Sequence, residues 1–247
     1  MRILVTRPQA DAAPLIAELE ARGHETLLQP LLTIEAARPP PEIDLEGVQA
    51  LLFTSANGLR GFAALSPRRD LPVFTVGDAS GAAARAAGFA RVESAGGDVE
   101  DLARLVIERL DPAAGAVFHG AGASLAGDLK GALEDAGFAV RRAVLYNAQP
   151  AETLAEDVRA ALAAGSLDAI AFFSPRTAVI FARLVEKHGL EAACATCRAV
   201  CLSAAVAERL GSLPWRGMTV AARPERDALL ACLDDPVDRG GVKGVRN

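Results

Sequence analysis

The chain has 247 residues and a formal net charge of −5, so it lacks the basic excess with which a dedicated nucleic-acid-binding protein attracts phosphates. Hydrophobic residues make up 51% and charged residues 23% of the sequence, as in an ordinary globular protein of one large domain or two small ones. No apolar run approaches 18 residues, and the start MRILVTRP does not have the form of a signal peptide. We therefore expect a cytoplasmic protein that binds neither membranes nor nucleic acid.

The N-terminal segment predicts a β-α-β unit of the parallel-sheet kind. A strand over Ile3–Thr6 is followed by Arg7 and by apolar residues at helical spacing, and Gly23 ends that helix. A second strand is expected over Glu25–Pro30. Three consecutive prolines, Pro39–Pro41, then predict a stiff connector and a domain boundary.

The middle of the chain alternates predicted strands and helices. The strand ends are followed by polar residues or glycines, which are the candidate ligand contacts in this part: Ser55 and Asn57, Gly77 and Ser80, Gly120, and Tyr146. Ser55 can cap the helix that follows the strand Ala50–Thr54. Tyr146, the only tyrosine, ends a strand over Ala139–Leu145.

The C-terminal part repeats this pattern. A strand ends before Ser174, which can cap a helix that begins with Pro175 and Arg176. Another strand, Ala199–Leu202, is followed by Ser203. The last residues, 236–247, are rich in glycine and charge, and we expect them to be disordered.

Two internal repeats interleave along the chain. Phe53 and Ser55 match Phe172 and Ser174 at an offset of 119 (172−53 and 174−55), whereas the first β-α-β unit matches residues 117–145 at an offset of 114 (Gly23 with Gly137, 137−23). The four repeats form two domains, and the sequence alone allows them to pair either in series or in an interleaved order.

Both repeated turns are suited to bind an anion, because free backbone N–H groups and the helix dipole favour negative charge at a helix N-terminus. The carboxyl ends of parallel strands are also where open α/β sheets bind ligands. The alternative for Ser55, Asn57, Ser174 and Arg176 is ordinary capping and surface charge. For Tyr146 the alternative is an amphipathic residue in a linker.

Two further patterns have competing interpretations. Gly120-Ala121-Gly122 after a strand resembles part of a dinucleotide fingerprint, but Leu125 replaces the third glycine. Cys194, Cys197 and Cys201, with His188 nearby, have a spacing seen in metal sites, but Cys201 lies in a predicted buried strand. We therefore expect no metal and no organic cofactor.

The chain resembles the uroporphyrinogen-III synthase family. The resemblance rests on motifs whose order and spacing span nearly the whole chain: ILVTRP at Ile3–Pro8, FTSANGLR at Phe53–Arg60, VFTVG at Val73–Gly77, AGDL at Ala126–Leu129, VLY at Val144–Tyr146 and FFSP at Phe172–Pro175. Two positions depart from the family pattern: Ser203-Ala204-Ala205 replaces a Gly-x-Thr-type turn, and Gly120-Ala121-Gly122 lacks a basic residue.

The resemblance implies an α/β fold of two flavodoxin-like parallel-sheet lobes, joined by a two-stranded linker, with the active site in the cleft. It favours the interleaved order, with lobe one at 1–36 and 152–235 and lobe two at 41–146. The implied reaction is a cofactor-free lyase reaction of heme biosynthesis that cyclises hydroxymethylbilane with loss of water and inversion of the terminal pyrrole.

The resemblance places the family's conserved tyrosine on Tyr146, as the catalytic residue. We expect the substrate contacts to come from the strand-to-helix turns, at Thr6, Arg7, Ser55, Asn57, Gly77, Ser80, Gly120, Ser174, Arg176 and Ser203. We expect a monomer. The rival interpretation is a non-catalytic two-lobed binder of a small anionic metabolite, and a nucleotide-dependent oxidoreductase is third.

Overall fold

The computed structural model describes residues 1–125 and 127–234. The chain divides into two compact units: unit 1 consists of Met1–Thr33 and the chain from Pro150 onward, and unit 2 consists of Ile34–Gln149. Unit 1 is therefore discontinuous in sequence. The expected tail at 236–247 lies outside the described residues.

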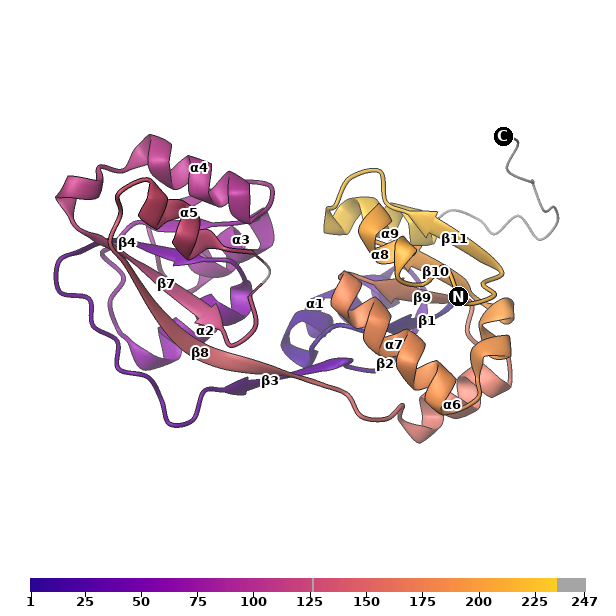
Figure 1. The fold of residues 1–247 in the computed structure, drawn as a ribbon. Helices are drawn as coiled ribbons and strands as arrows, with labels where there is room; N and C mark the ends of the chain where they lie inside the picture. Colours follow the sequence, from indigo (N-terminus) through magenta and orange to yellow (C-terminus); the bar gives the residue numbers. More distant parts are fainter. Residues whose placement is uncertain (126, 235–247) are drawn as a thin grey trace. The chain divides into compact units, whose positions relative to one another are not determined.

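Unit 1 is built on a parallel sheet with the strand order β11-β10-β9-β1-β2 (Figure 1). Its strands are β1 (Arg2–Val5), β2 (Glu25–Leu28), β9 (Ala169–Phe172), β10 (Arg198–Cys201) and β11 (Gly217–Val220). Its helices are α1 (Gln9–Ala21), α6 (Glu156–Ala163), α7 (Pro175–Lys187), α8 (Ala204–Glu208) and α9 (Arg226–Asp234), with a short 3-10 helix η2 (Glu191–Thr196).

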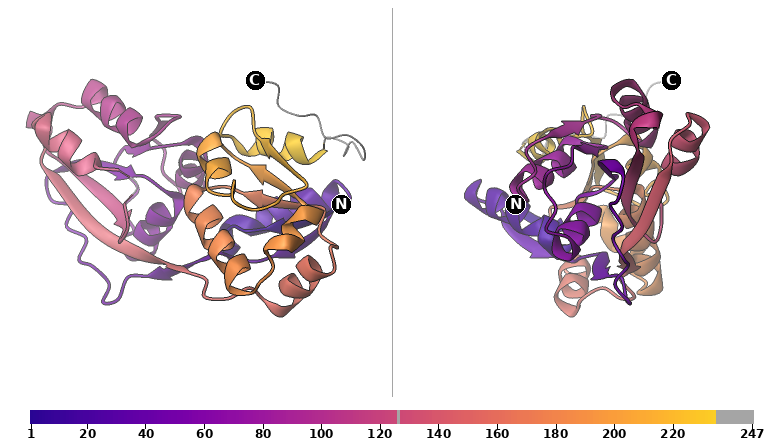
Figure 2. Two further views of the ribbon diagram at one scale, coloured as in Figure 1. Left: turned by 45° about the vertical axis from the view of Figure 1, so that its right-hand side comes forward. Right: turned by 90° about the vertical axis from the view of Figure 1, so that its left-hand side faces the viewer.

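Unit 2 is built on a sheet with the order β3-β8-β7-β4-β5-β6. Its strands are β3 (Leu32–Ala36), in which the chain enters the unit, β4 (Val48–Phe53), β5 (Val73–Thr75), β6 (Val92–Ser94), β7 (Ala116–Gly122) and β8 (Val140–Pro150). Its helices are α2 (Ala56–Leu65), α3 (Asp78–Ala86), α4 (Val99–Arg109) and α5 (Leu129–Asp135), with a 3-10 turn η1 (Pro112–Ala114). Both views in Figure 2 show β8 as one long continuous strand.

In unit 1 helices cover both faces of the sheet, because its central strands are apolar on both sides. On one face Ile3 and Val5 of β1 pack with Leu15 of α1 and Leu229 of α9. On the other face Phe172 of β9 lies against Phe181 of α7, with ring centroids 5.1 Å apart, and against Trp215 at 5.9 Å. The sheet is thus enclosed between two helical layers.

Unit 2 has the same layered arrangement. One core joins Phe53 of β4 and Phe118 of β7 to Phe62 of α2, whose ring centroid is 5.6 Å from that of Phe53 and 5.7 Å from that of Phe118. The opposite core joins Val117 of β7 to helices α4 and α5. Helices α2 and α3 therefore cover one face of the sheet, and α4 and α5 cover the other.

The structure differs from the expected elements at three places. Part of the expected connector is strand β3, whose neighbour in the sheet is β8, and Ala37 N–H donates to the Leu145 carbonyl at 3.0 Å. Strand β7 continues to Gly122, and β8 continues to Pro150, so Tyr146 lies inside a strand. Helix α5 begins at Leu129, although the leucine spacing predicts a helix that includes Leu125, and Leu125 is exposed before the helix.

In the described part of the chain, no helix has both the length and the hydropathy needed to cross a membrane.

His119 is a buried titratable residue in β7. Its exposed fraction is 1%, and neither ring nitrogen has a hydrogen-bond partner among the described residues. Burial lowers the pKa of His119 from 6.5 to about 4, and the charge of Arg142, which lies opposite on β8, acts in the same direction. The folded protein therefore keeps this imidazole neutral.

The stability of unit 2 should consequently fall in mild acid. Between pH 6.5 and about 4 the unfolded chain binds a proton at His119 that the folded chain does not, so the free energy of unfolding rises with pH across this window. The full effect is about 3 kcal/mol, at 1.36 kcal/mol per pKa unit. Urea unfolding of the whole chain between pH 7 and 4.5, followed by circular dichroism, should show a flatter dependence for His119→Leu than for wild type. An equal dependence in the two proteins would contradict this role of His119.

Candidate active site

In each sheet the direction of winding reverses between two neighbouring strands. In unit 2 the chain runs from β4 outward to β5 and β6, but from β7 outward to β8 on the other side. In unit 1 it runs from β1 to β2, but from β9 to β10 and β11 on the other side. Ligands of open α/β sheets bind at such points, beyond the carboxyl ends of the strands. The candidate sites therefore lie after β4 and β7 in unit 2, and after β1 and β9 in unit 1.

At the reversal point of unit 2, the caps of α2 and the phenol of Tyr146 come together. Ser55 has an extended backbone and precedes α2, and its Oγ accepts from Gly58 N–H at 3.2 Å. The Tyr146 hydroxyl oxygen is 2.9 Å from this Oγ. Both side chains are half-buried, so the pair is accessible to a ligand. The structure thus joins two residues that were expected to act separately.

Gly122 makes room for this phenol. A Cβ on Gly122 would lie 2.7 Å from Cζ and 3.0 Å from the hydroxyl oxygen of Tyr146. The backbone holds the same pairing, since Ala123 N–H donates to the Tyr146 carbonyl at 3.0 Å. Gly122 was not among the expected site residues, and the sequence gives no direct signal of its partner on β8.

Gly120 does not form the turn expected of it. It lies within β7, is buried, and a Cβ there would lie 2.6 Å from the ring of Phe53. Its carbonyl oxygen would be 2.4 Å from a Cβ on Gly58, so the two glycines allow α2 to approach β7 closely. Gly120 thus has a packing role within the strand, and the substrate contact expected of it stays a prediction. The dinucleotide interpretation requires a phosphate-binding turn at Gly120-Ala121-Gly122, but these residues form part of strand β7.

The reversal point of unit 1 has the same cap without the phenol. Ser174 precedes α7, and its Oγ accepts from Thr177 N–H at 3.2 Å. Its hydroxyl contacts the Thr177 hydroxyl at 3.0 Å, and Pro175 occupies the first turn of the helix. The repeated motif therefore supplies two helix N-termini of closely similar geometry.

Thr6 and Arg7 follow β1 at this point but have different environments. Thr6 is 0% exposed, and its hydroxyl donates to the Ala171 carbonyl of β9 at 2.7 Å. Its hydroxyl therefore links β1 to β9, and the substrate contact expected of Thr6 stays a prediction. The Arg7 guanidinium is half-exposed, lies 4.8 Å from the ring centroid of Phe173, and pairs with Asp11 at 3.5 Å. Arg7 thus keeps a cation at the carboxyl edge of the sheet.

The two serine-capped helices, α2 and α7, differ from the other long helices in the charge of their first turns. Among described helices of eight or more residues, only α2 and α7 have no Asp or Glu in the first turn. An acidic residue there cancels part of the positive potential of a helix N-terminus. That potential is therefore preserved at the two reversal points. It is reduced at α3, where Asp78 follows Gly77.

The remaining expected contacts occupy several environments. Asn57 is half-buried in the first turn of α2 and accepts from Arg60, and Arg176 is exposed in the first turn of α7. Gly77 precedes α3, whereas Ser80 is buried within that helix, so contact of its hydroxyl with a substrate is not supported. Ser203 precedes α8 without a side-chain cap.

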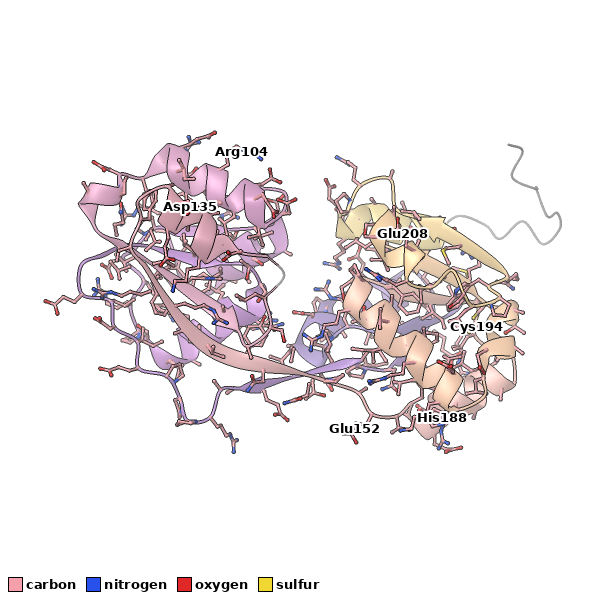
Figure 3. All side chains as sticks on the ribbon, viewed as in Figure 1. Arg104, Asp135, Glu152, His188, Cys194 and Glu208 are labelled. Atoms are coloured by element: carbon pink, nitrogen blue, oxygen red, sulfur yellow. The ribbon has the colours of Figure 1, made fainter. Side chains whose placement is uncertain are left out.

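The three clustered cysteines lie in the interior of unit 1. Cys194, Cys197 and Cys201 are fully buried, and burial raises the pKa values of their thiols to about 11, 12 and 11. Figure 3 shows His188 at the end of α7 and Cys194 in the segment that follows. Among the described residues no group of three His, Cys, Asp or Glu side chains could hold a metal ion. The thiols are core residues.

Comparison with known proteins agrees with this geometry. A curated relative, the uroporphyrinogen-III synthase of Chlorobaculum parvum, is 29% identical over 197 residues, which cover 72% of this chain and 77% of the relative. The fold is similar to crystal structures of the enzymes from Helicobacter pylori and Thermus thermophilus (a mutant), with TM-scores of 0.59 and 0.53. Identities to them are 18% and 19%; both alignments cover 94% of this chain, and 98% and 97% of the respective structures.

The family profile described as uroporphyrinogen-III synthase HemD matches residues 13–231. This match includes the turns before α2 and α7, the phenol of Tyr146 and every strand except β1. The chain belongs to the uroporphyrinogen-III synthase family.

Proposed function

We propose that this chain is a lyase that cyclises hydroxymethylbilane to uroporphyrinogen III, with loss of water and inversion of the last pyrrole ring, in tetrapyrrole synthesis. Family membership supports the activity. The main structural support in this chain is the phenol of Tyr146. Its hydroxyl oxygen lies 2.9 Å from Ser55 Oγ, at the N-terminus of a helix that has no acidic residue in its first turn. This arrangement offers one hydroxyl donor for chemistry beside a positive potential for binding.

The substrate explains why the donors are spread over several turns. Hydroxymethylbilane carries eight carboxylates, so it needs many N–H, hydroxyl and cationic partners without a dense basic patch. The free N–H groups at α2 and α7, together with Arg7, Asn57, Arg176 and Ser203, can serve this purpose. Charge-assisted hydrogen bonds to carboxylates are about twice as strong as neutral ones.

The chemical role of Tyr146 follows from the bond that breaks. The hydroxyl of the terminal hydroxymethyl group leaves with both electrons of its C–O bond, while the electron-rich pyrrole supplies a pair to the remaining carbon. The phenol proton passes to the departing oxygen, which leaves as water. A ring carbon loses its hydrogen when the last pyrrole regains aromaticity, and that proton restores the phenol. The sum is loss of one water.

The inversion is a problem of conformation. The far pyrrole must be attacked at its substituted carbon, giving a spiro intermediate. The bond from that carbon to its original methylene bridge then breaks, and the methylene joins the free carbon, which loses its hydrogen. Direct closure at the free carbon instead gives the non-inverted isomer. We propose that the distributed carboxylate contacts select the first geometry, because orientation of reacting groups contributes more here than acid strength. We also propose that the protein acts as a monomer in the cytoplasm, where its four free thiols would remain reduced.

The direct test is turnover of hydroxymethylbilane generated enzymatically in the assay. The chain should be desalted and treated with a chelator, and its products oxidised and separated by chromatography. We expect the type III isomer to dominate. Activity that is lost on chelation and restored by zinc would contradict the metal-free reaction. Tight retention of the bilane without turnover would instead support a non-catalytic binder.

Asn57→Asp should weaken substrate binding while leaving the fold intact. The change is nearly isosteric, and a carboxylate in the first turn of α2 favours the helix but repels a bound carboxylate. We expect KM to rise at least about fivefold, from like-charge repulsion of ~1 kcal/mol. Asn57→Ser controls for loss of the amide without added charge and should raise KM less. Equal KM values for the two variants would contradict anion binding at this turn.

Tyr146→Phe should lower kcat with little change in KM, because the lost donor acts on the departing hydroxyl in the transition state. We expect a loss of roughly ten- to a hundredfold, at or below the low end for general acids, since this leaving group departs readily. Phenylalanine keeps the ring beside Gly122, and thermal melts should verify folding. The product should remain the type III isomer. If the variant kept the wild-type kcat, Tyr146 would have no role in the mechanism. If it released mainly the non-inverted isomer, Tyr146 would also orient the terminal ring.

A further inference from the structure

The phenol of Tyr146 is fixed from two sides within unit 2. Its hydroxyl oxygen lies 2.9 Å from Ser55 Oγ. The opposite constraint comes from Gly122, where an added Cβ would lie 2.7 Å from Cζ of the ring. Strand pairing places Gly122 directly opposite Tyr146, after a register shift in which β8 has one extra residue, Leu145. The position of the phenol is thus set by residues from β7 and from the turn after β4.

Ser55 is itself held in place. Its Oγ accepts from Gly58 N–H at 3.2 Å, which occupies one of its two lone pairs. Its single proton can point toward the phenol oxygen, or it can point away and let the phenol donate to Ser55. Helix α2 has no acidic residue in its first turn, so this end keeps its positive potential. That potential favours a hydroxyl proton directed away from the helix, toward Tyr146.

We propose that Ser55 donates its hydrogen bond to the phenol oxygen of Tyr146 and thereby leaves the phenol proton free for the substrate. Gly58, Ser55 and Tyr146 then form one chain of donors that begins at the helix N-terminus. A hydroxyl that accepts a hydrogen bond becomes a stronger donor itself. Ser55 and Gly122 are positioning residues for Tyr146, and this role rests on the proposed function because it assigns the proton donor of that reaction.

The same donors also stabilise the negative charge that the reaction creates on the phenol oxygen. When the phenol proton passes to the departing hydroxyl, the electron pair of the O–H bond stays on the phenol oxygen. The Ser55 hydroxyl proton then points toward that negative oxygen, and Gly58 N–H still donates to Ser55 Oγ. The proton released from the ring carbon at the end of the reaction neutralises the phenol again.

Ser174 is a matched control for Ser55. Both residues precede a helix with nearly the same backbone angles, −156° and 153° for Ser55 and −152° and 151° for Ser174. Both hydroxyl oxygens accept a cap hydrogen bond at 3.2 Å. The further partner of Ser174 is the hydroxyl of Thr177, not a phenol. Replacing each serine by alanine therefore removes the same cap, but only Ser55→Ala removes the partner of Tyr146.

The spectroscopic test needs no turnover, so it is independent of the proposed function. The chain contains one tyrosine, so the tyrosine Fermi doublet in its Raman spectrum reports Tyr146 alone. The intensity ratio of this doublet distinguishes a phenol that accepts a hydrogen bond from one that donates. We expect an accepting phenol in wild type and in Ser174→Ala, and a changed ratio in Ser55→Ala and Gly122→Ala. A donating phenol in wild type, or an unchanged ratio in Ser55→Ala, would overturn the proposal.

The kinetic test uses a double-mutant cycle. We expect Ser55→Ala to lower kcat by about fivefold, the effect of one lost hydrogen bond, and Ser55→Thr to restore it. Combined with Tyr146→Phe, Ser55→Ala should lower kcat no further, because the phenol it positions is already absent. Ser174→Ala should instead raise KM. In the double variant with Tyr146→Phe, the two changes should act independently, so that their effects on kcat/KM multiply. Independent effects of Ser55→Ala and Tyr146→Phe on kcat would overturn the coupling.

Discussion

Reversal of the winding direction between two neighbouring parallel strands is the constraint on which each unit depends. It occurs between β4 and β7 in unit 2 and between β1 and β9 in unit 1. Because helices leave the two strands toward different faces, the backbone N–H groups at this edge are not covered by a neighbouring connection. Helices α2 and α7 begin there, and neither has an acidic residue in its first turn. The same sheet geometry therefore places two helix N-termini of similar geometry at the reversal points, from one repeated sequence motif.

The two turns have diverged in their second partner. Ser55 contacts the phenol of Tyr146, whereas Ser174 contacts the hydroxyl of Thr177. The difference arises from β8, whose pairing with β7 ends at Tyr146, opposite Gly122, at the carboxyl edge of the sheet. A capped helix N-terminus is thus present in both units, while the only phenol of the chain belongs to one. This asymmetry matches a reaction with many carboxylate contacts and a single leaving group.

Much of this arrangement could be predicted from the sequence, because it depends on local signals. Ser55 and Ser174 were recognised as caps from the repeat, and the structure shows both cap hydrogen bonds. The contacts that depend on strand pairing could not be predicted. Thr6 has the sequence context of a turn donor, yet its hydroxyl is used by the neighbouring strand β9.

The glycines of β7 illustrate the same limit. A Gly-x-Gly run after apolar residues is typical of a phosphate-binding turn, but here both glycines lie within the strand. Gly120 admits the ring of Phe53, and Gly122 admits the ring of Tyr146. These partners come from β4 and β8, so their identity depends on strand order and register. A sequence pattern shows that close approach is possible but not which residue approaches.

We propose that the turns at the two reversal points bind carboxylates of the tetrapyrrole. Hydrogen exchange measured by mass spectrometry, with and without anaerobic uroporphyrinogen III, tests it most directly because it locates protected amides without any substitution. We expect slower exchange in peptides that contain the first turns of α2 and α7, around Gly58 and Thr177. Bound product that leaves both turns unchanged and protects amides elsewhere would contradict it.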